Sequence, residues 1–266
     1  MHIFRYGNFT VFRSRLYMTN STVVDMGRSV LICDPSWLPD EIIAISEFVQ
    51  NKYKDYQKYL FISHFDFDHL WGWPVFNDAQ IICPDPNIFA EQAINGLMEW
   101  IEWDENHYII RPYKATLPEN ILLPLTSDEI FMENESDIHF FSVPGHTVDS
   151  FAAFLPKQNI LLAGDYLSDV EIPWIGTNPE EYAHSLDVFS RIITEHKPAY
   201  VIPGHGDVHH SYRDALKIIE DAQKYINCLI KGKCPKGFTE KYISSFPFEK
   251  ASETIHEQNK KISRLK

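Results

Sequence analysis

The residues best suited to chemistry lie in one hexapeptide, His64-Phe65-Asp66-Phe67-Asp68-His69. Four of its six side chains can bind a divalent metal ion, and they directly follow an apolar run, residues 59–63, that is typical of a buried strand. A strand that ends in imidazoles and carboxylates holds these groups at a sheet edge, where substrate can reach them. Histidine nitrogen combined with carboxylate oxygen suits zinc, iron or manganese better than calcium or magnesium. Taken alone, the segment fits an acidic, histidine-containing loop about equally well.

Three later strand-like runs end in the same way, with glycine beside a single possible metal ligand. The segments Pro144-Gly145-His146-Thr147, Gly164-Asp165 and Pro203-Gly204-His205-Gly206 each follow an apolar run. Glycine lets the backbone turn sharply and direct the neighbouring side chain towards a common point. One such pair predicts only a turn. Four such strand ends in one chain indicate a shared site.

In this order the motifs resemble those of the metallo-β-lactamase superfamily of hydrolases. The family's first signature is His-x-His-x-Asp-His, followed by a lone His, a bridging Asp and a last His. The matching positions in this chain are His64, Asp66, Asp68, His69, His146, Asp165 and His205. The resemblance extends to about residue 210. It has two departures: Asp66 replaces the usual second His, and Val148-Asp149 replaces a frequent Pro-Gly, although Ser150 is retained.

The resemblance implies an α+β fold, a four-layer αβ/βα sandwich of two mixed β-sheets flanked by helices, with metals at one sheet edge. It implies two divalent metal ions, with zinc as the first choice and iron or manganese as alternatives. One site would take His64, Asp66 and His146, the other Asp68, His69 and His205, with Asp165 between them. The expected activity is hydrolysis by a bridging hydroxide. Asp68 is also the candidate for moving protons.

Asp66 changes the expected charge of this centre. A third carboxylate brings the formal charge of two metals, their ligands and a hydroxide to about zero, rather than about +1, which favours oxygen-preferring cations over zinc. A diiron branch of the superfamily, the flavodiiron oxygen and nitric oxide reductases, carries Glu at this position. A diiron redox protein is therefore the alternative, although this chain shows no flavodoxin domain. A non-catalytic metal-binding protein is a second alternative, disfavoured because all seven positions keep ligating side chains.

Composition and charge limit the classes of substrate and partner that we expect. The 266 residues carry a formal charge of −13 and show no Lys/Arg cluster, so we expect a small-molecule substrate and no nucleic acid. If the aromatic and acidic segment 97–113 lines the substrate cleft, its ring faces and carboxylates suit an apolar or cationic group, which favours an ester, thioester or lactone over a polyanion. No apolar run approaches the roughly 20 residues of a membrane span, so no membrane partner is expected.

The absence of a signal-peptide pattern and the scattered cysteines, with Cys33 and Cys83 as buried thiols, indicate a cytoplasmic protein. The oligomeric state stays open.

The sequence also predicts the domain, strands and helices that must position these residues. We expect one domain over 1–266, with 232–266 as a peripheral C-terminal segment. Apolar or alternating runs at 3–6, 9–18, 22–25 and 30–33 predict a meander of strands. Helices are predicted from Asn178-Pro179 onwards and over 211–230. The aromatic and acidic segment 97–113 is interpreted as an amphipathic helix packed by Leu97, Trp100, Ile101 and Trp103, with a wall of the substrate cleft as the alternative.

Overall fold

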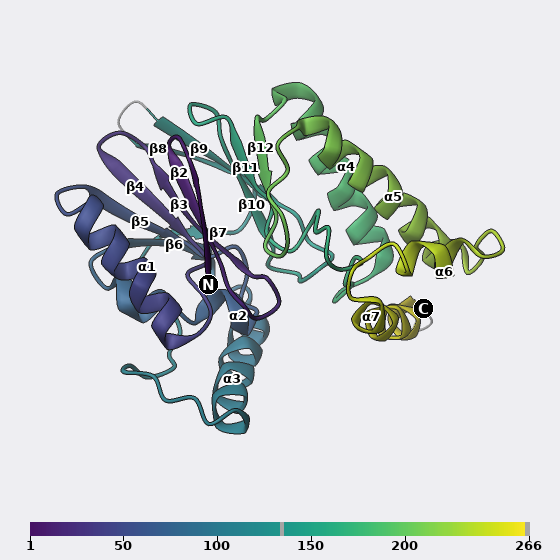
Figure 1. Cartoon of the computed structure of the whole chain (residues 1–266), viewed down its shortest axis with the longest axis horizontal. Helices are drawn as coiled ribbons and strands as arrows, with labels where there is room; N and C mark the ends of the chain where they lie inside the picture. The colour runs from purple at the N-terminus through teal and green to yellow at the C-terminus, as the bar shows by residue number, and fades with distance from the viewer. Residues whose placement is uncertain (134–135, 264–266) are drawn as a thin grey trace. The chain divides into compact units, whose positions relative to one another are not determined.

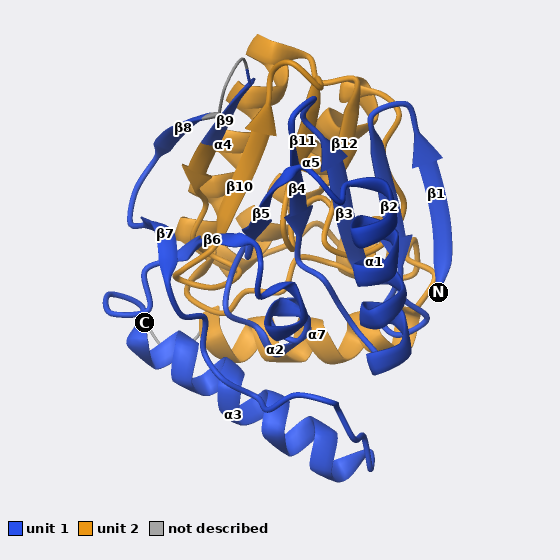
Figure 2. Cartoon of the chain, turned by 90° about the vertical axis from the view of Figure 1, so that its left-hand side faces the viewer, with its two compact units in different colours: residues 1–139 blue, residues 140–266 orange. Residues whose placement is uncertain are grey.

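The computed structural model describes residues 1–133 and 136–263. The chain divides into two compact units, residues 1–139 and 140–266 (Figures 1 and 2). Each unit has a hydrophobic core of its own. The single domain expected from the sequence therefore stays a prediction, and the two units are described separately. Among the described residues, no helix combines the length and the apolar character needed to cross a membrane.

The first unit is built on a seven-stranded mixed sheet whose strands lie side by side in chain order. The first four strands form the predicted antiparallel meander, and the next three run parallel to the fourth. Parallel neighbours end at the same edge, so the segments that follow the fourth and fifth strands leave the sheet together. The strands are β1 (His2–Tyr6), β2 (Phe9–Arg13), β3 (Asn20–Asp25), β4 (Ser29–Cys33), β5 (Gln57–Phe61), β6 (Gln80–Pro84) and β7 (Ile121–Leu125).

Two helices of the first unit determine how the hexapeptide is held. The short helix α2 (Phe67–Leu70) begins inside it, and the long helix α3 (Ala90–Asn106) packs against it. At Gly96 of α3 an added Cβ would lie 1.7 Å from the backbone oxygen of Phe65, so only glycine allows this approach. Helix α1 (Pro39–Lys52) contributes Ile42, Ile45 and Val49 to the core. A 3-10 turn, η1 (Trp73–Phe76), follows α2.

The second sheet has five strands in the order β12-β11-β10-β9-β8 and is also mixed, because β10 and β11 are antiparallel while β11 and β12 are parallel. Its strands are β8 (Glu129–Glu133), β9 (Ser136–Ser142), β10 (Phe151–Leu155), β11 (Ile160–Leu162) and β12 (Tyr200–Ile202). The boundary between the units falls inside β9.

The helices of the second unit are α4 (Pro179–His196), α5 (Tyr212–Lys231), α6 (Phe238–Ile243) and α7 (Glu249–Ser263). The two predicted helices are confirmed as α4 and α5. Asn178 caps α4 by accepting the Glu181 amide at 2.9 Å, and Ser211 caps α5 by accepting the Arg213 amide at 3.1 Å. Ile255 of α7 joins the core of this unit, so this helix packs against it.

The cysteines follow the prediction in part. Cys33 and Cys83 are buried free thiols, as expected. Cys228 and Cys234, which the sequence interpretation left unpaired, form a disulfide across the end of α5.

Candidate metal centre

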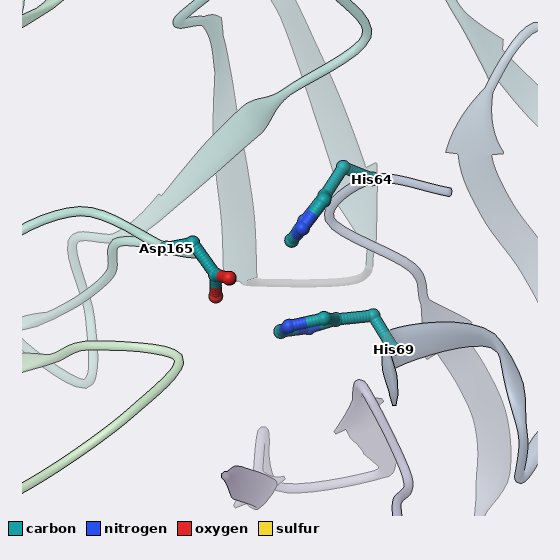
Figure 3. Close-up of side chains that lie close together, drawn as sticks. All are labelled: His64, His69 and Asp165. Atoms are coloured by element: carbon teal, nitrogen blue, oxygen red, sulfur yellow. The ribbon is translucent and has the colours of Figure 1, made fainter. Parts of the chain in front are cut away.

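The first unit brings the four ligands of the hexapeptide together, and we call His64, Asp66, Asp68 and His69 the first half-site. The imidazoles of His64 and His69 are buried side by side, with ring centroids 4.2 Å apart (Figure 3). Each faces a carboxylate: His64 Nε2 lies 3.6 Å from Asp66 Oδ2, and His69 Nε2 lies 3.7 Å from Asp68 Oδ2. Asp66 occupies the N-cap of α2, but its side chain makes no capping bond there. Its carboxylate is thus directed to the imidazole rather than to the helix.

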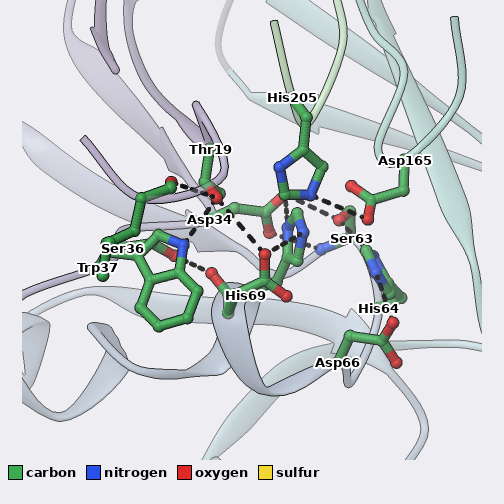
Figure 4. Close-up of polar contacts among 12 residues, drawn as sticks. Thr19, Asp34, Ser36, Trp37, Ser63, His64, Asp66, His69, Asp165 and His205 are labelled. Carbon is green, nitrogen blue, oxygen red and sulfur yellow. Dashed lines mark hydrogen bonds and ion pairs between the residues drawn. The ribbon is translucent and has the colours of Figure 1, made fainter. Parts of the chain in front are cut away.

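Asp34, which the sequence interpretation did not single out, organises this half-site from behind (Figure 4). It follows β4, beside the segment that follows β5, and only 2% of its surface is exposed. Its carboxylate accepts hydrogen bonds from the Ser63 amide at 2.8 Å and the Ser63 hydroxyl at 2.7 Å, and lies 3.1 Å from His69 Nδ1. Burial raises the pKa of Asp34, but the imidazoles of His69 and His64 and the Ser63 amide together outweigh it, and the net pKa is below its ordinary value. Asp34 is therefore a charged acceptor that holds the proton of His69 on Nδ1.

The remaining members of the first half-site are also held by hydrogen bonds. The Ser63 hydroxyl lies 2.9 Å from His64 Nδ1. Thr19 donates its hydroxyl to Asp68 Oδ2 at 3.4 Å and accepts from the Trp37 indole at 2.7 Å (Figure 4). Such partners behind the ligands orient metal-binding side chains and set their tautomers.

Residues 97–106 of the aromatic segment belong to α3, as predicted, but residues 107–113 lie beyond the end of the helix, and the packing differs in one residue. Trp100 is fully buried and Trp103 stacks on Phe67 of the hexapeptide, with ring centroids 5.6 Å apart. Ile101, expected in the core, is 37% exposed. The helix repeats every 3.6 residues, which turns Ile101 away once Gly96 and Trp100 face inwards. On the same helix burial raises the pKa of Glu99, and repulsion by Asp66 and Asp68 raises it further.

The second unit supplies the second half-site: His146, Asp165 and His205. These side chains follow β9, β11 and β12, respectively. Asp165 Oδ2 lies 3.3 Å from His146 Nε2 and 3.1 Å from His205 Nε2. One carboxylate oxygen thus lies between two imidazoles, the arrangement expected of a ligand shared by two ions. A carboxylate oxygen of Glu171, for which the sequence offered no signal, lies within 4.8 Å of ligand atoms of both Asp165 and His205.

Two glycines make this geometry possible, as their place in the motifs predicted. Gly145 has φ +132, and a Cβ there would lie 2.5 Å from the Tyr182 Cα. At Gly204 a Cβ would lie 2.1 Å from Asp165 Oδ1. A larger residue at either position would displace a ligand or its support.

His146 is held on both sides. Its amide donates to the Tyr166 hydroxyl at 3.0 Å, which donates in turn to the Pro144 carbonyl at 2.9 Å. Burial raises the pKa of Tyr166, so this phenol stays protonated. His146 Nδ1 lies 3.1 Å from the Trp174 carbonyl oxygen, which can only accept. Nδ1 therefore carries a proton, and Nε2, beside Asp165, is the ring nitrogen that could bind a metal ion.

The donors fit a divalent transition-metal ion. In both half-sites the Nε2 atoms of histidines lie next to carboxylates, and in His69 and His146 an acceptor behind Nδ1 holds the ring proton away from Nε2. Neutral imidazole and carboxylate are the ligands of zinc, iron and manganese sites. Three histidines outside the motifs make other contacts or none with the two half-sites: His139 pairs with Asp137 at 2.5 Å, His107 stacks on Trp103, and His184 is exposed on α4.

A family model described as the metallo-beta-lactamase superfamily matches residues 15–205, well over half of the 266 residues. The chain belongs to this superfamily. The lactamase-like protein nscB of Arthroderma benhamiae is 27% identical over 148 residues, which are 55% of this chain and 28% of that protein. This superfamily consists mostly of hydrolases.

Solved structures agree on the fold. The inverting sec-alkylsulfatase Pisa1 from Pseudomonas sp. matches with a TM-score of 0.70 and 12% identity, over 96% of this chain and 50% of its own. A metallo-beta-lactamase from Pontibacter korlensis matches with a TM-score of 0.56 and 13% identity, over 82% of this chain and 98% of its own. The chain thus spans about a quarter of nscB and half of Pisa1. The expected α+β sandwich of two mixed sheets flanked by helices is confirmed.

Proposed function

We propose that this chain is a metal-dependent hydrolase in which the two half-sites together hold two divalent ions. One ion would be held by His64, Asp66 and His146, the other by Asp68, His69 and His205, with Asp165 shared. The observation that carries the proposal is the place of Asp165, whose Oδ2 lies within 3.3 Å of the Nε2 atoms of both His146 and His205. When bound, the ions would supply a Lewis acid and a water of lowered pKa.

The residues around the ligands would keep the donors ready for this role. Asp34 holds the His69 ring by its Nδ1 proton, and the Trp174 carbonyl does the same for His146. Asp68 is held by the Thr19 hydroxyl and can take or give a proton at Oδ2 as well as ligate. Contacts of this kind orient metal-binding side chains and set their tautomers.

For the substrate we propose an uncharged ester, thioester or lactone with an apolar group. The formal charge of −13 and the carboxylates of Asp66, Asp68 and Glu99 disfavour a polyanion. Apolar surface is available beside both half-sites: Trp103 stacks on Phe67 in the first, and the 45% exposed indole of Trp174 lies edge-on to His146 in the second, with ring centroids 6.2 Å apart. Zinc remains our first choice of metal.

A substrate panel tests the proposal. Uncharged nitrophenyl esters, a thioester and a lactone would be compared with a secondary alkyl sulfate, a phosphodiester, RNA and DNA, each with and without a chelator. We expect chelator-sensitive hydrolysis of at least one uncharged substrate, and its loss in Asp165→Ala. Strong nuclease activity that falls steeply with salt would contradict the substrate class. Ester hydrolysis that survives both the chelator and Asp165→Ala would contradict the metal-dependent mechanism.

A further inference from the structure

We propose that Asn259, on the C-terminal helix α7, is a positioning residue for the metal ligand His146, and that it acts through a single peptide group, the one between Trp174 and Ile175. This inference rests on the proposed function only in taking His146 as a ligand. It assigns a role in the metal centre to a helix for which the sequence predicted none.

The Trp174–Ile175 peptide group is held from both sides. Its carbonyl oxygen accepts the Nδ1 proton of His146 at 3.1 Å. Its N–H donates to Asn259 Oδ1 at 3.0 Å. In a trans peptide the C=O and N–H bonds point in opposite directions from one rigid plane. The bond to Asn259 therefore fixes the direction in which the carbonyl faces His146.

Asn259 also clamps the residue that precedes this peptide. Its Nδ2 donates to the Pro173 carbonyl at 2.6 Å and to the Tyr225 hydroxyl at 3.1 Å. The side chain is fully buried, and the Tyr225 hydroxyl lies 2.8 Å from His256 Nδ1, so α5 and α7 support the amide together. An amide that makes three hydrogen bonds in a buried site has one orientation, because its flipped form would set donor against donor and acceptor against acceptor.

Residues 173–177, which include this peptide group, also form hydrogen bonds with the loop that carries His146. The amides of Gly176 and Thr177 donate to the Gly145 carbonyl at 3.0 and 3.2 Å. A Cβ at Gly176 would lie 2.2 Å from the His146 carbonyl oxygen, so the two backbones touch. Segment 173–177 thus links α7 to the ligand loop at the backbone level.

Loss of Asn259 would free this peptide to rotate and leave His146 without a fixed acceptor at Nδ1. Without that acceptor the ring can place its proton on Nε2, the nitrogen offered to the metal. Removing a partner that orients a metal-binding histidine typically weakens metal binding about 10–100-fold. The same rotation would move Trp174, so the substrate affinity should change together with the metal affinity.

The variant Asn259→Leu keeps a similar volume and removes all three hydrogen bonds. Its matched control is Ile255→Ala, one turn earlier on α7, which removes core packing in the same unit but leaves the three hydrogen bonds of Asn259 in place. Zinc affinity would be measured by chelator competition, and the unfolding temperature of the metal-free protein would be recorded for each variant. Of the two zinc ions, we expect the more weakly bound one to bind Asn259→Leu about 10–100-fold less tightly than it binds the parent. We expect Ile255→Ala to lose stability but keep its zinc affinity.

A second measurement needs no substrate. In the zinc-loaded parent, NMR should show the His146 Nδ1 proton, donated to the Trp174 carbonyl, in slow exchange with water, and Asn259→Leu should show faster exchange of that proton. If Asn259→Leu does not fold, Asn259→Asp keeps the acceptor for the Ile175 amide and should retain slow exchange. The inference is overturned if this proton exchanges equally fast in the parent and in Asn259→Leu, if Asn259→Leu binds zinc like the parent, or if Ile255→Ala loses as much affinity. A parent that binds zinc but hydrolyses no substrate would refute the proposed function and leave this inference intact.

Discussion

Two substitutions of Asp34 separate the two roles of its buried carboxylate, which stabilises the fold and holds the proton of His69 on Nδ1. It accepts two hydrogen bonds from Ser63 and holds the Nδ1 proton of His69, at 2.8, 2.7 and 3.1 Å. A hydrogen bond to a charged group contributes about 1.5–3 kcal/mol, and removing one partner of a buried charged network costs about 3–5 kcal/mol. Asp34→Ala should therefore lower the free energy of unfolding of the metal-free protein by about 3–5 kcal/mol, measured by urea denaturation.

Asp34→Asn tests the tautomer with less damage to the fold. Its amide oxygen can still accept the Ser63 N–H, while its NH₂ group would face Ser63 Oγ and His69 Nδ1. A donor facing Nδ1 requires that nitrogen to accept, which moves the His69 proton to Nε2. We expect nitrogen-15 NMR to show this change, together with a zinc affinity about 10–100-fold lower than that of the parent.

The control is Asp137→Asn, which alters the half-exposed pair formed by Asp137 and His139 in the same unit. It should leave the zinc affinity unchanged. If Asp34→Asn keeps both the Nδ1 tautomer and the parental affinity, Asp34 does not set the state of His69.

The remaining predictions concern individual carboxylates and ligands. Asp66→His restores the usual family residue and makes the charge of the site more positive by one unit. Purified from the same medium as the parent, the variant should hold more zinc relative to iron, and the rise of its activity with pH should occur at lower pH. If the zinc-to-iron ratio and the pH dependence are both unchanged, Asp66 is not a ligand. Burial and the charges of Asp66 and Asp68 raise the pKa of Glu99 in the folded protein above its value in the unfolded chain. Protonated Glu99 therefore favours the folded state over ionised Glu99, and this stabilisation is lost as the pH rises through the folded pKa. In the metal-free protein Glu99→Gln should therefore be more stable than the parent at pH 7, with the difference vanishing near pH 4 in urea denaturation; an equal difference at both pH values would refute the electrostatic cause. Asp68→Ala and His146→Ala should lower the metal content, whereas His107→Ala and His139→Ala should not, by elemental analysis.

Sequence reasoning singled out the candidate ligands because each motif residue follows a strand-like run directly. Parallel strands end at the same edge of a sheet, as β11 and β12 do, so order along the chain was enough to group Asp165 with His205. Asp34 gave the same kind of signal, since it follows the run 30–33, but a lone Asp before proline is common in turns. It becomes informative only when the parallel pairing of β4 and β5 places it beside His69.

Other features depend on packing that periodicity does not encode. Helices α4 and α5 were predictable because Asn178 and Ser211 are efficient N-caps. The sequence indicated a peripheral segment over 232–266, but nothing in its pattern indicates that Asn259 of α7 is buried against the loop of another segment. The buried face of α3 was misjudged at Ile101, because the close approach at Gly96 sets the rotation of the helix.

Metal stoichiometry tests the central claim most directly. The parent and Asp165→Ala would be purified without added metal, loaded with an excess of zinc, separated from the excess and analysed for zinc per chain. A shared carboxylate predicts close to two ions per chain in the parent and a loss in the variant that affects both ions. A parent that holds at most one ion per chain, or a variant that still holds two, would contradict a dinuclear centre built on these seven residues.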